Sequence, residues 1–428
     1  MRDMTTVGER AARVVVAIGL VILTMAVGSA QSTGSAVLTS SAPGQTLVLS
    51  RAEAAARARM LASIGRRMFV DPALSASGRM SCATCHSATR AFGPPNDRPV
   101  QFGGVALDQP GVRAVPSLRY LQTAPAFIEH YFESPEEGDE STDAGPTGGL
   151  NWDGRVDRGR DQVLVPLFSP FEMANADAAT LARSVARAPY AADLRAAFGD
   201  DLFANPDAVV RAIGEAFEAY EQTPAEFFPY TSKFDAVMRG QMAFTPQERR
   251  GFALFEDPAK GDCARCHFSV MGRNFELPQF TDFSLIALGV PRNSAIPANG
   301  DPGYYDLGMC GPLRTDLATR PEYCGLFMTP TLRNAATREA FFHNGVFHTL
   351  REVVQFYAER DTNPEKWYPV DADGRVKKFD DLPAAYRANV EMETPFGGQP
   401  GDSPPLTSDD IDDIVAFIET LTDGWRGE

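Results

Sequence analysis

A Cys-x-x-Cys-His pattern occurs twice in this chain and limits what the chain can fold into. On one helical turn, residues i, i+3 and i+4 point the same way, so the thiols and the imidazole face one flat partner. In such a pattern the thiols bond to the vinyl groups of a haem, and the imidazole ligates its iron. One copy alone would also suit a redox dithiol or half of a zinc site, but two complete copies predict two covalently bound c-type haems. The attachment residues are Cys82, Cys85, His86, Cys263, Cys266 and His267.

The N-terminus is typical of an export signal. Three arginines in the first thirteen residues precede an apolar run from Val14 to Gly28, and Ser29-Ala30 adds small residues for cleavage. We therefore expect residues 1–30 to be a signal peptide and the mature protein to be periplasmic, with a retained anchor as the alternative. No second long apolar run occurs, so we expect no membrane span after removal of the signal.

Two of the six cysteines, Cys310 and Cys324, are not needed for haem attachment. An exported protein meets an oxidising compartment, and these two cysteines lie close together in the sequence. We predict a disulfide between them, with two free thiols as the alternative.

The formal net charge of −16 argues against nucleic acid or an anionic membrane surface as a partner. An acidic face would steer a basic electron-transfer partner, although a solvated surface needs no such explanation.

The two motifs follow similar segments. Residues 64–72 and 250–258 each contain a glycine, an apolar residue next to a phenylalanine, and Asp-Pro. Each half then closes with a helical pattern, at 207–222 and 408–423. The chain is therefore predicted to be mainly α, with two tandem cytochrome c-like helical haem domains and long loops. We expect a flexible linker at 31–50, an N-terminal haem domain at 51–223 and a C-terminal haem domain at 224–428.

The thirty-two prolines and thirty-six glycines favour long irregular connections. We predict that residues 133–149, rich in Glu, Gly and Asp, and residues 291–327, around the two spare cysteines, are surface insertions.

Segment 349–359 is predicted to be a helix with one buried stripe. Leu350, Val353, Val354 and Tyr357 recur at helical spacing. The Tyr357 hydroxyl therefore points inward, where a polar tip needs a partner. From the spacing alone, that partner is either a haem iron or a buried hydrogen-bond acceptor.

The order of several short motifs resembles the bacterial di-haem cytochrome c peroxidase superfamily, and within it the MauG and MbnH branch. These motifs cover nearly the whole mature chain and are specific in combination. They are Asp71-Pro72-Ala73-Leu74-Ser75, Asn151-Trp152-Asp153-Gly154-Arg155, Phe171-Glu172-Met173, Pro330-Thr331-Leu332-Arg333-Asn334, Phe342-His343-Asn344-Gly345 and Phe356-Tyr357.

The resemblance implies a role for several residues at matching positions. Tyr357 would ligate the second haem iron, where the family's peroxidases place a methionine. Trp152 would lie between the haems and relay charge. Gln162, Pro166 and Glu172 would form the pocket over the first haem, with Glu172 as the acid–base group. Pro166 has no ligating or donating side-chain atom, so it would leave the first iron open to peroxide.

The chain departs from the family pattern in its histidines. The family's cytochrome c peroxidases carry a histidine in the loop after the first haem motif, but residues 87–129 contain none. We expect His130 to lie at the surface or near the haem without ligating it. His343 is expected near the second haem, also without ligating it, and His348 has no assigned role.

Two further departures concern metal and substrate. Family members often bind calcium between the domains through a Thr-x-Pro run, but residues 338–340 are Arg-Glu-Ala here, which argues against calcium. MauG passes charge to its substrate through a surface tryptophan, whereas residues 260–262 are Lys-Gly-Asp. The MauG substrate reaction therefore does not carry over.

The sequence favours a periplasmic di-haem oxidase that uses hydrogen peroxide to reach a high-valent di-haem state and oxidises aromatic residues of a partner protein. The alternative is a di-haem cytochrome c peroxidase that takes electrons from a small cytochrome c or cupredoxin. A plain electron carrier is a third hypothesis, because the thioethers of Met271, Met309 and Met328 are available as ligands.

Overall fold

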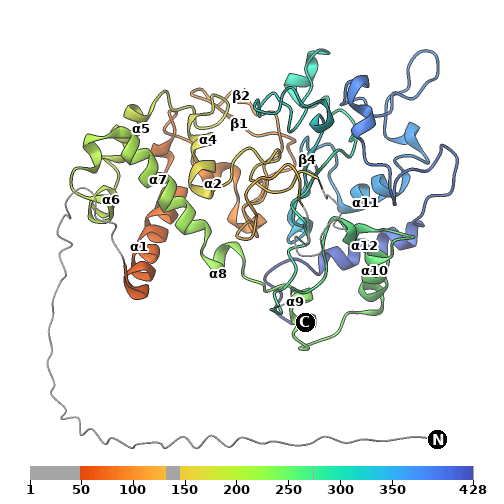
Figure 1. Ribbon diagram of the computed structural model, residues 1–428, viewed down its shortest axis with the longest axis horizontal. Helices are drawn as coiled ribbons and strands as arrows, with labels where there is room; N and C mark the ends of the chain where they lie inside the picture. Colours follow the sequence, from red (N-terminus) through yellow and green to blue (C-terminus); the bar gives the residue numbers. More distant parts are fainter. Residues whose placement is uncertain (1–48, 132–144, 273, 428) are drawn as a thin grey trace, which may run out of the picture. The chain divides into compact units, whose positions relative to one another are not determined.

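Helices joined by long irregular loops make up most of the described chain (Figure 1). The computed structural model describes residues 49–131, 145–272 and 274–427. The predicted signal peptide lies outside these residues, as does all but the end of the predicted linker. No helix in the described ranges is long and apolar enough to cross a membrane. The α-helices are α1 (Arg51–Phe69), α2 (Cys82–Cys85), α3 (Gly159–Gln162), α4 (Leu164–Phe168), α5 (Ala178–Val185), α6 (Ala191–Phe198), α7 (Pro206–Glu221), α8 (Pro224–Phe227), α9 (Lys233–Met238), α10 (Pro246–Glu256), α11 (Leu350–Glu359) and α12 (Ser408–Glu419).

Strands in the described part form two short antiparallel pairs. β1 (Phe102–Gly103) pairs with β2 (Gln109–Pro110), and β3 (Leu285–Ile286) pairs with β4 (Phe327–Met328). This small amount of sheet agrees with the predicted mainly α class.

The predicted repeat has a structural counterpart in two crossed helix pairs, α1 with α7 and α10 with α12 (Figure 1). A glycine in the first helix of each pair allows the close approach. A Cβ added at Gly65 would lie 2.1 Å from the Ala216 carbonyl oxygen, and one added at Gly251 would lie 1.9 Å from that of Asp413. Real Cβ atoms do not come so close to backbone, so each crossing requires a glycine. Both glycines belong to the repeated segments ahead of the haem motifs.

Capping side chains explain where the predicted helices begin. The Asn205 side chain accepts hydrogen bonds from two backbone N–H groups, and Pro206 occupies the first turn of α7. Thr349 and Glu352 form a capping box ahead of α11. The predicted helices at 207–222 and 349–359 are confirmed to within one residue at each end.

Apolar residues gather in three clusters that follow the order of the sequence. The buried members of the first cluster lie between Leu61 and Phe227, and those of the other two lie between Phe234 and Leu421. The predicted join at Thr223-Pro224 lies just before this change of core, although Phe227 still packs in the first cluster. The division into two haem domains at this point stays a prediction.

Two predicted surface insertions are partly wrong. Residues 132–144 lie outside the described residues, but Thr147 is buried and forms bridges to Ile128 and Ser284. Within 291–327, Met309 and Leu317 belong to a hydrophobic core. These segments lack helical or strand periodicity, which made them resemble solvated loops, yet they supply core side chains.

The predicted disulfide between Cys310 and Cys324 is present in the structure, and both cysteines are buried. The bond closes a short loop within the 291–327 segment. A loop of this size removes enough unfolded-state entropy to stabilise a protein by about 3 kcal/mol.

Replacing both Cys310 and Cys324 with alanine is therefore expected to lower the free energy of unfolding by about 3 kcal/mol, visible as a lower Tm by circular dichroism. A reducing agent should move the unmodified protein toward the Tm of the variant and leave the variant itself unchanged. Equal Tm values for the two proteins would contradict a stabilising role for the bond.

A polar junction connects residues far apart in the sequence. The Asp423 carboxylate accepts hydrogen bonds from the Tyr120 hydroxyl at 2.9 Å and the Asn334 amide at 2.7 Å. It also forms an ion pair with Arg119 at 3.1 Å, and its side chain is 4% exposed. Thr231 donates its backbone N–H to the same carboxylate. One side chain near the C-terminus thus fixes the loop that follows the first haem motif.

Candidate functional site

The first Cys-x-x-Cys-His motif forms the short helix α2 and its C-cap. Cys82 and Cys85 lie at the two ends of α2, and His86 follows directly. The His86 Nδ1–H donates to the Phe92 carbonyl oxygen at 2.8 Å. This bond fixes the imidazole plane and leaves Nε2 free as a ligand.

The second motif differs slightly in its backbone. Cys263 to Arg265 form a 3-10 turn, and Cys266 is its C-cap. The His267 Nδ1–H donates to the Phe280 carbonyl oxygen at 2.9 Å, as His86 does in the first motif. Both histidines are therefore oriented by a backbone carbonyl and present the same nitrogen.

The chemistry of both motifs suits covalently bound haem. Burial raises the pKa of Cys82 and Cys85 to about 12, with a further contribution from nearby carboxylates, and the same holds for Cys263 and Cys266. Burial lowers the pKa of both motif histidines to about 4. These sites hold uncharged sulfur and neutral imidazole, which are the states of a thioether bond and of an iron ligand.

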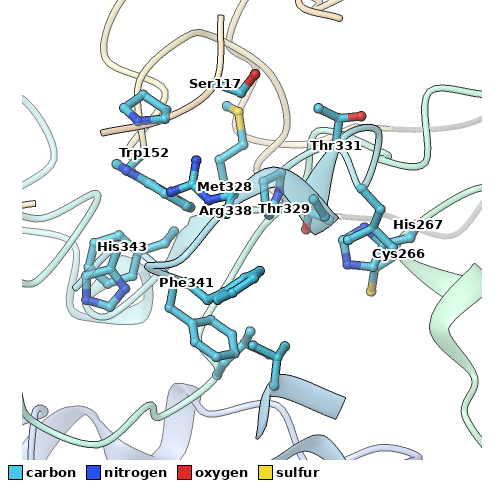
Figure 2. Close-up of a pocket in the computed structure, with 18 of the residues that line it drawn as sticks. Ser117, Trp152, Cys266, His267, Met328, Thr329, Thr331, Arg338, Phe341 and His343 are labelled. Carbon is cyan, nitrogen blue, oxygen red and sulfur yellow. The ribbon is translucent and has the colours of Figure 1, made fainter. Parts of the chain in front are cut away.

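One large internal cavity extends from the second motif toward the first half of the chain. Its lining includes Cys266, His267 and Trp152 (Figure 2). Trp152 is 9% exposed, and its indole N–H donates to the Ala114 carbonyl oxygen at 2.7 Å. The indole is thus fixed in the wall of a cavity that also contains the histidine of the second motif. Its predicted place between the two haems is compatible with this position.

Tyr357 lies on α11 and lines the same cavity as Cys263, Cys266 and His267. Its ring packs on Phe342 and Phe396, with centroids 6.1 and 5.2 Å away. Burial raises its pKa, and the Cys266 and Cys263 thiols add to the shift.

The Tyr357 hydroxyl has no hydrogen-bond partner among the described residues, which weakens the alternative of a buried hydrogen bond. Its role as iron ligand stays a prediction.

The three residues predicted to form the first-haem pocket are placed differently. Gln162 lines the large cavity and donates from its amide to the Asn151 side-chain oxygen at 3.1 Å. Pro166 lies within α4 and outside the lining of that cavity. Glu172 follows α4, and its backbone oxygen accepts from Gly104 N–H at 2.8 Å.

Glu172 is a half-buried carboxyl rather than the solvated surface charge that its residue type alone would suggest. Burial raises its pKa above the ordinary value, against smaller opposite effects of Ser169 and Arg155. Its negative charge in turn raises the pKa of the Cys85 thiol. The structure therefore brings Glu172 close to the first haem attachment site.

Glu221, at the end of α7, was missed by sequence reasoning. It lines the large cavity, and burial, assisted by Glu218, raises its pKa to about 8. It also raises the pKa of the Cys82 thiol. Helical spacing could have identified Glu221, because it follows a buried phenylalanine by four residues and so lies on the core-facing stripe of a predicted helix.

The remaining histidines occupy three different environments. His130 is exposed, in agreement with a surface position. His343 is buried, lines the cavity and stacks on Phe327 at 3.5 Å between centroids. His348 is exposed, and its Nδ1–H donates to the Glu339 carbonyl oxygen at 2.8 Å.

The calcium position suggested by the family does not fit this chain. Arg338 occupies it, and the Arg338 Nε–H donates to the Ala340 carbonyl oxygen at 3.1 Å. A guanidinium at this place would repel a divalent cation, so the prediction against calcium rests on this charge.

Comparisons with known proteins agree with the haem chemistry of the site. A family profile described as di-haem cytochrome c peroxidase matches residues 59–243. The methylamine utilization protein MauG of Paracoccus denitrificans is 33% identical over 376 residues, covering 85% of this chain and 88% of that protein. The cytochrome c551 peroxidase of Nitrosomonas europaea is 24% identical and covers 71% of this chain and 75% of its own.

A solved structure is also similar. The di-haem peroxidase BthA from Burkholderia thailandensis is 42% identical with a TM-score of 0.76, and the match covers 85% of this chain and 86% of that chain. A MauG-like protein associated with microbial copper homeostasis, 24% identical with a TM-score of 0.57 over 85% of this chain and 89% of its own, shares the fold.

These matches confirm the predicted fold class and cofactors, and the family profile spans the first haem motif. The protein carries two covalently bound c-type haems and is a haem-dependent oxidoreductase that acts on peroxide. The chain belongs to the di-haem cytochrome c peroxidase family.

Proposed function

We propose that this enzyme uses hydrogen peroxide to oxidise aromatic side chains of an exported partner protein, as expected for the MauG-like branch. The observation that carries the proposal is Tyr357. Tyr357 lines the cavity that contains Cys263, Cys266 and His267, and its hydroxyl has no hydrogen-bond partner among the described residues. An anionic oxygen ligand would stabilise oxidised iron and favour the storage of oxidising equivalents over rapid turnover.

In this proposal each side chain has a defined task. The haems supply the redox chemistry when bound. Glu172 accepts a proton from one peroxide oxygen and returns it to the other as the O–O bond breaks. Pro166 contributes no ligand or donor. Overall, peroxide takes up two electrons and two protons to give two waters, and the electrons come from the partner's aromatic side chain.

The partner reaction can be tested by mass spectrometry. The holoenzyme is incubated with peroxide and candidate exported proteins, and their aromatic residues are compared before and after. Loss of two hydrogens or gain of oxygen on a partner supports the proposal. Fast peroxide turnover with a reduced small cytochrome c or cupredoxin, without modification of any partner, would favour the cytochrome c peroxidase alternative.

Trp152 provides a further prediction. Trp152→Phe keeps an aromatic ring in the cavity wall but removes the indole and its hydrogen bond to Ala114, at a cost of about 1 kcal/mol. We expect the variant to keep its full haem content. After peroxide is added, the absorption of the second haem should change more slowly than that of the first, as measured by stopped-flow spectroscopy.

A matched control is Trp367→Phe. Trp367 packs edge-on against Phe356 with centroids 5.6 Å apart and lies outside the cavity lining. This variant should respond like the unmodified protein. Identical rates for the Trp152 and Trp367 variants would remove Trp152 from the charge path.

A further inference from the structure

Arg338 is half-buried and differs from three arginines whose side chains are almost fully enclosed. Arg113, Arg333 and Arg360 each hold an aspartate at 2.6 to 3.0 Å. Arg338 forms no ion pair with any described residue. Burial alone shifts its pKa, downward to about 10, so the group keeps its proton at neutral pH. No acidic side chain among the described residues therefore balances the charge of this half-buried guanidinium.

Two backbone carbonyls hold the Arg338 guanidinium in place. Nε–H donates to the Ala340 oxygen at 3.1 Å, and Nη2–H donates to the Val115 oxygen at 3.0 Å. Nη1 makes no hydrogen bond to the described residues and lies on the side of Gly93. Carbonyl groups are neutral, so this arrangement fixes the orientation of the guanidinium without balancing its charge.

The other charged and titratable groups nearby do not balance it either. Arg90 and Glu339 pair with each other at 2.8 Å and are partly exposed. The His348 imidazole donates to the Glu339 carbonyl oxygen, and its backbone N–H donates to the Glu352 carboxylate. The Arg338 charge lowers the pKa of His86, the iron ligand of the first motif, which places the charge close to the first haem site.

Arg338 also lines the large cavity, together with Trp152 and His267 (Figure 2). An isolated buried charge is costly, so an anion is expected to face it when the protein is complete. Each haem brings two propionate carboxylates. We infer that the Arg338 guanidinium is the fixed counter-ion for a haem propionate in this cavity, so the chain supplies its own cation where relatives were expected to use a metal.

The inference rests on the two haems and not on the oxidation of a partner. The midpoint potentials of the haems, measured without peroxide, therefore test it. The test compares Arg338→Met with Arg338→Lys in the holoprotein, after a haem assay shows two haems in each. A nearby cation stabilises the reduced haem. We expect the Met variant to lower the midpoint potential of at least one haem and the Lys variant to keep it near that of the unmodified protein.

The pH dependence gives a second readout. A buried propionate without its cation has a raised pKa, so it takes up a proton on reduction. The potential of the Met variant should therefore fall as pH rises through the neutral range, with a smaller slope in the Lys variant. His86, His348 and the Arg90–Glu339 pair are common to both variants and cancel in the comparison.

Three results would overturn the inference. The first is an unchanged potential in the Met variant, and the second is an equal fall in the Lys variant. If Arg338→Met does not mature, Arg338→Gln removes the same charge while keeping amide donors for the two carbonyls. If neither variant matures, infrared difference spectroscopy of the unmodified holoprotein decides. The third result that would overturn the inference is then a haem propionate that is protonated at neutral pH.

Discussion

Replacing Tyr357 with phenylalanine is expected to abolish the oxygen-ligated low-spin signal of the haem bound at Cys263 and Cys266. The substitution removes one oxygen atom and leaves the ring packed between Phe342 and Phe396. Because the Tyr357 hydroxyl has no partner among the described residues, no hydrogen bond is lost. Burial raises the pKa of this phenol, so only a bound cation would convert it to phenolate.

Electron paramagnetic resonance of the ferric holoprotein provides the measurement, with a haem assay to show that both cofactors are attached. Tyr368→Phe is a matched control. Tyr368 belongs to the same hydrophobic core, but its hydroxyl donates to the Gly289 carbonyl oxygen at 2.6 Å. The control should lose about 1 kcal/mol of stability and keep the spectrum. An unchanged spectrum in the Tyr357 variant would exclude Tyr357 as a ligand.

Replacing Glu172 with glutamine is expected to slow the reaction with peroxide by about 10²- to 10⁴-fold, the usual contribution of a positioned acid–base group. Glutamine keeps the shape of the side chain but cannot accept the peroxide proton. Stopped-flow spectroscopy at saturating peroxide measures the rate, and haem content should be unchanged.

The pH profile identifies the group. Burial raises the pKa of Glu172, and the carboxylate is the form that accepts a proton. The rate should therefore rise with pH through a pKa above that of an ordinary glutamate, and this rise should be absent from Glu172→Gln. Glu221→Gln is the control, because Glu221 is a second half-buried carboxyl, with its pKa raised to about 8. Loss of the rise in that variant alone would transfer the role to Glu221.

Sequence reasoning predicted the parts of this protein that depend on local pattern. Motif spacing predicted the attachment cysteines and histidines, and apolar periodicity located α7 and α11. The spare cysteines Cys310 and Cys324 identified the disulfide. Each of these features is encoded within a few neighbouring residues.

Features that depend on distant contacts could not be predicted in this way. Thr147 is buried because it meets Ile128 and Ser284, although its own segment has no apolar periodicity. The Arg338 guanidinium is held by the carbonyl groups of Ala340 and of the distant Val115, and it has no acidic partner among the described residues. The presence of an arginine at position 338 was enough to argue against calcium. That its guanidinium lines a haem cavity could be learned only from the fold.

The junction at Asp423 has a consequence for biogenesis. The loop carrying Arg119 and Tyr120 depends on a carboxylate encoded some three hundred residues later. The N-terminal part of a chain is synthesised before the C-terminal part, so this contact can close only after Asp423 has been made. A variant without the Asp423 carboxylate is expected to leave that loop more accessible to proteases.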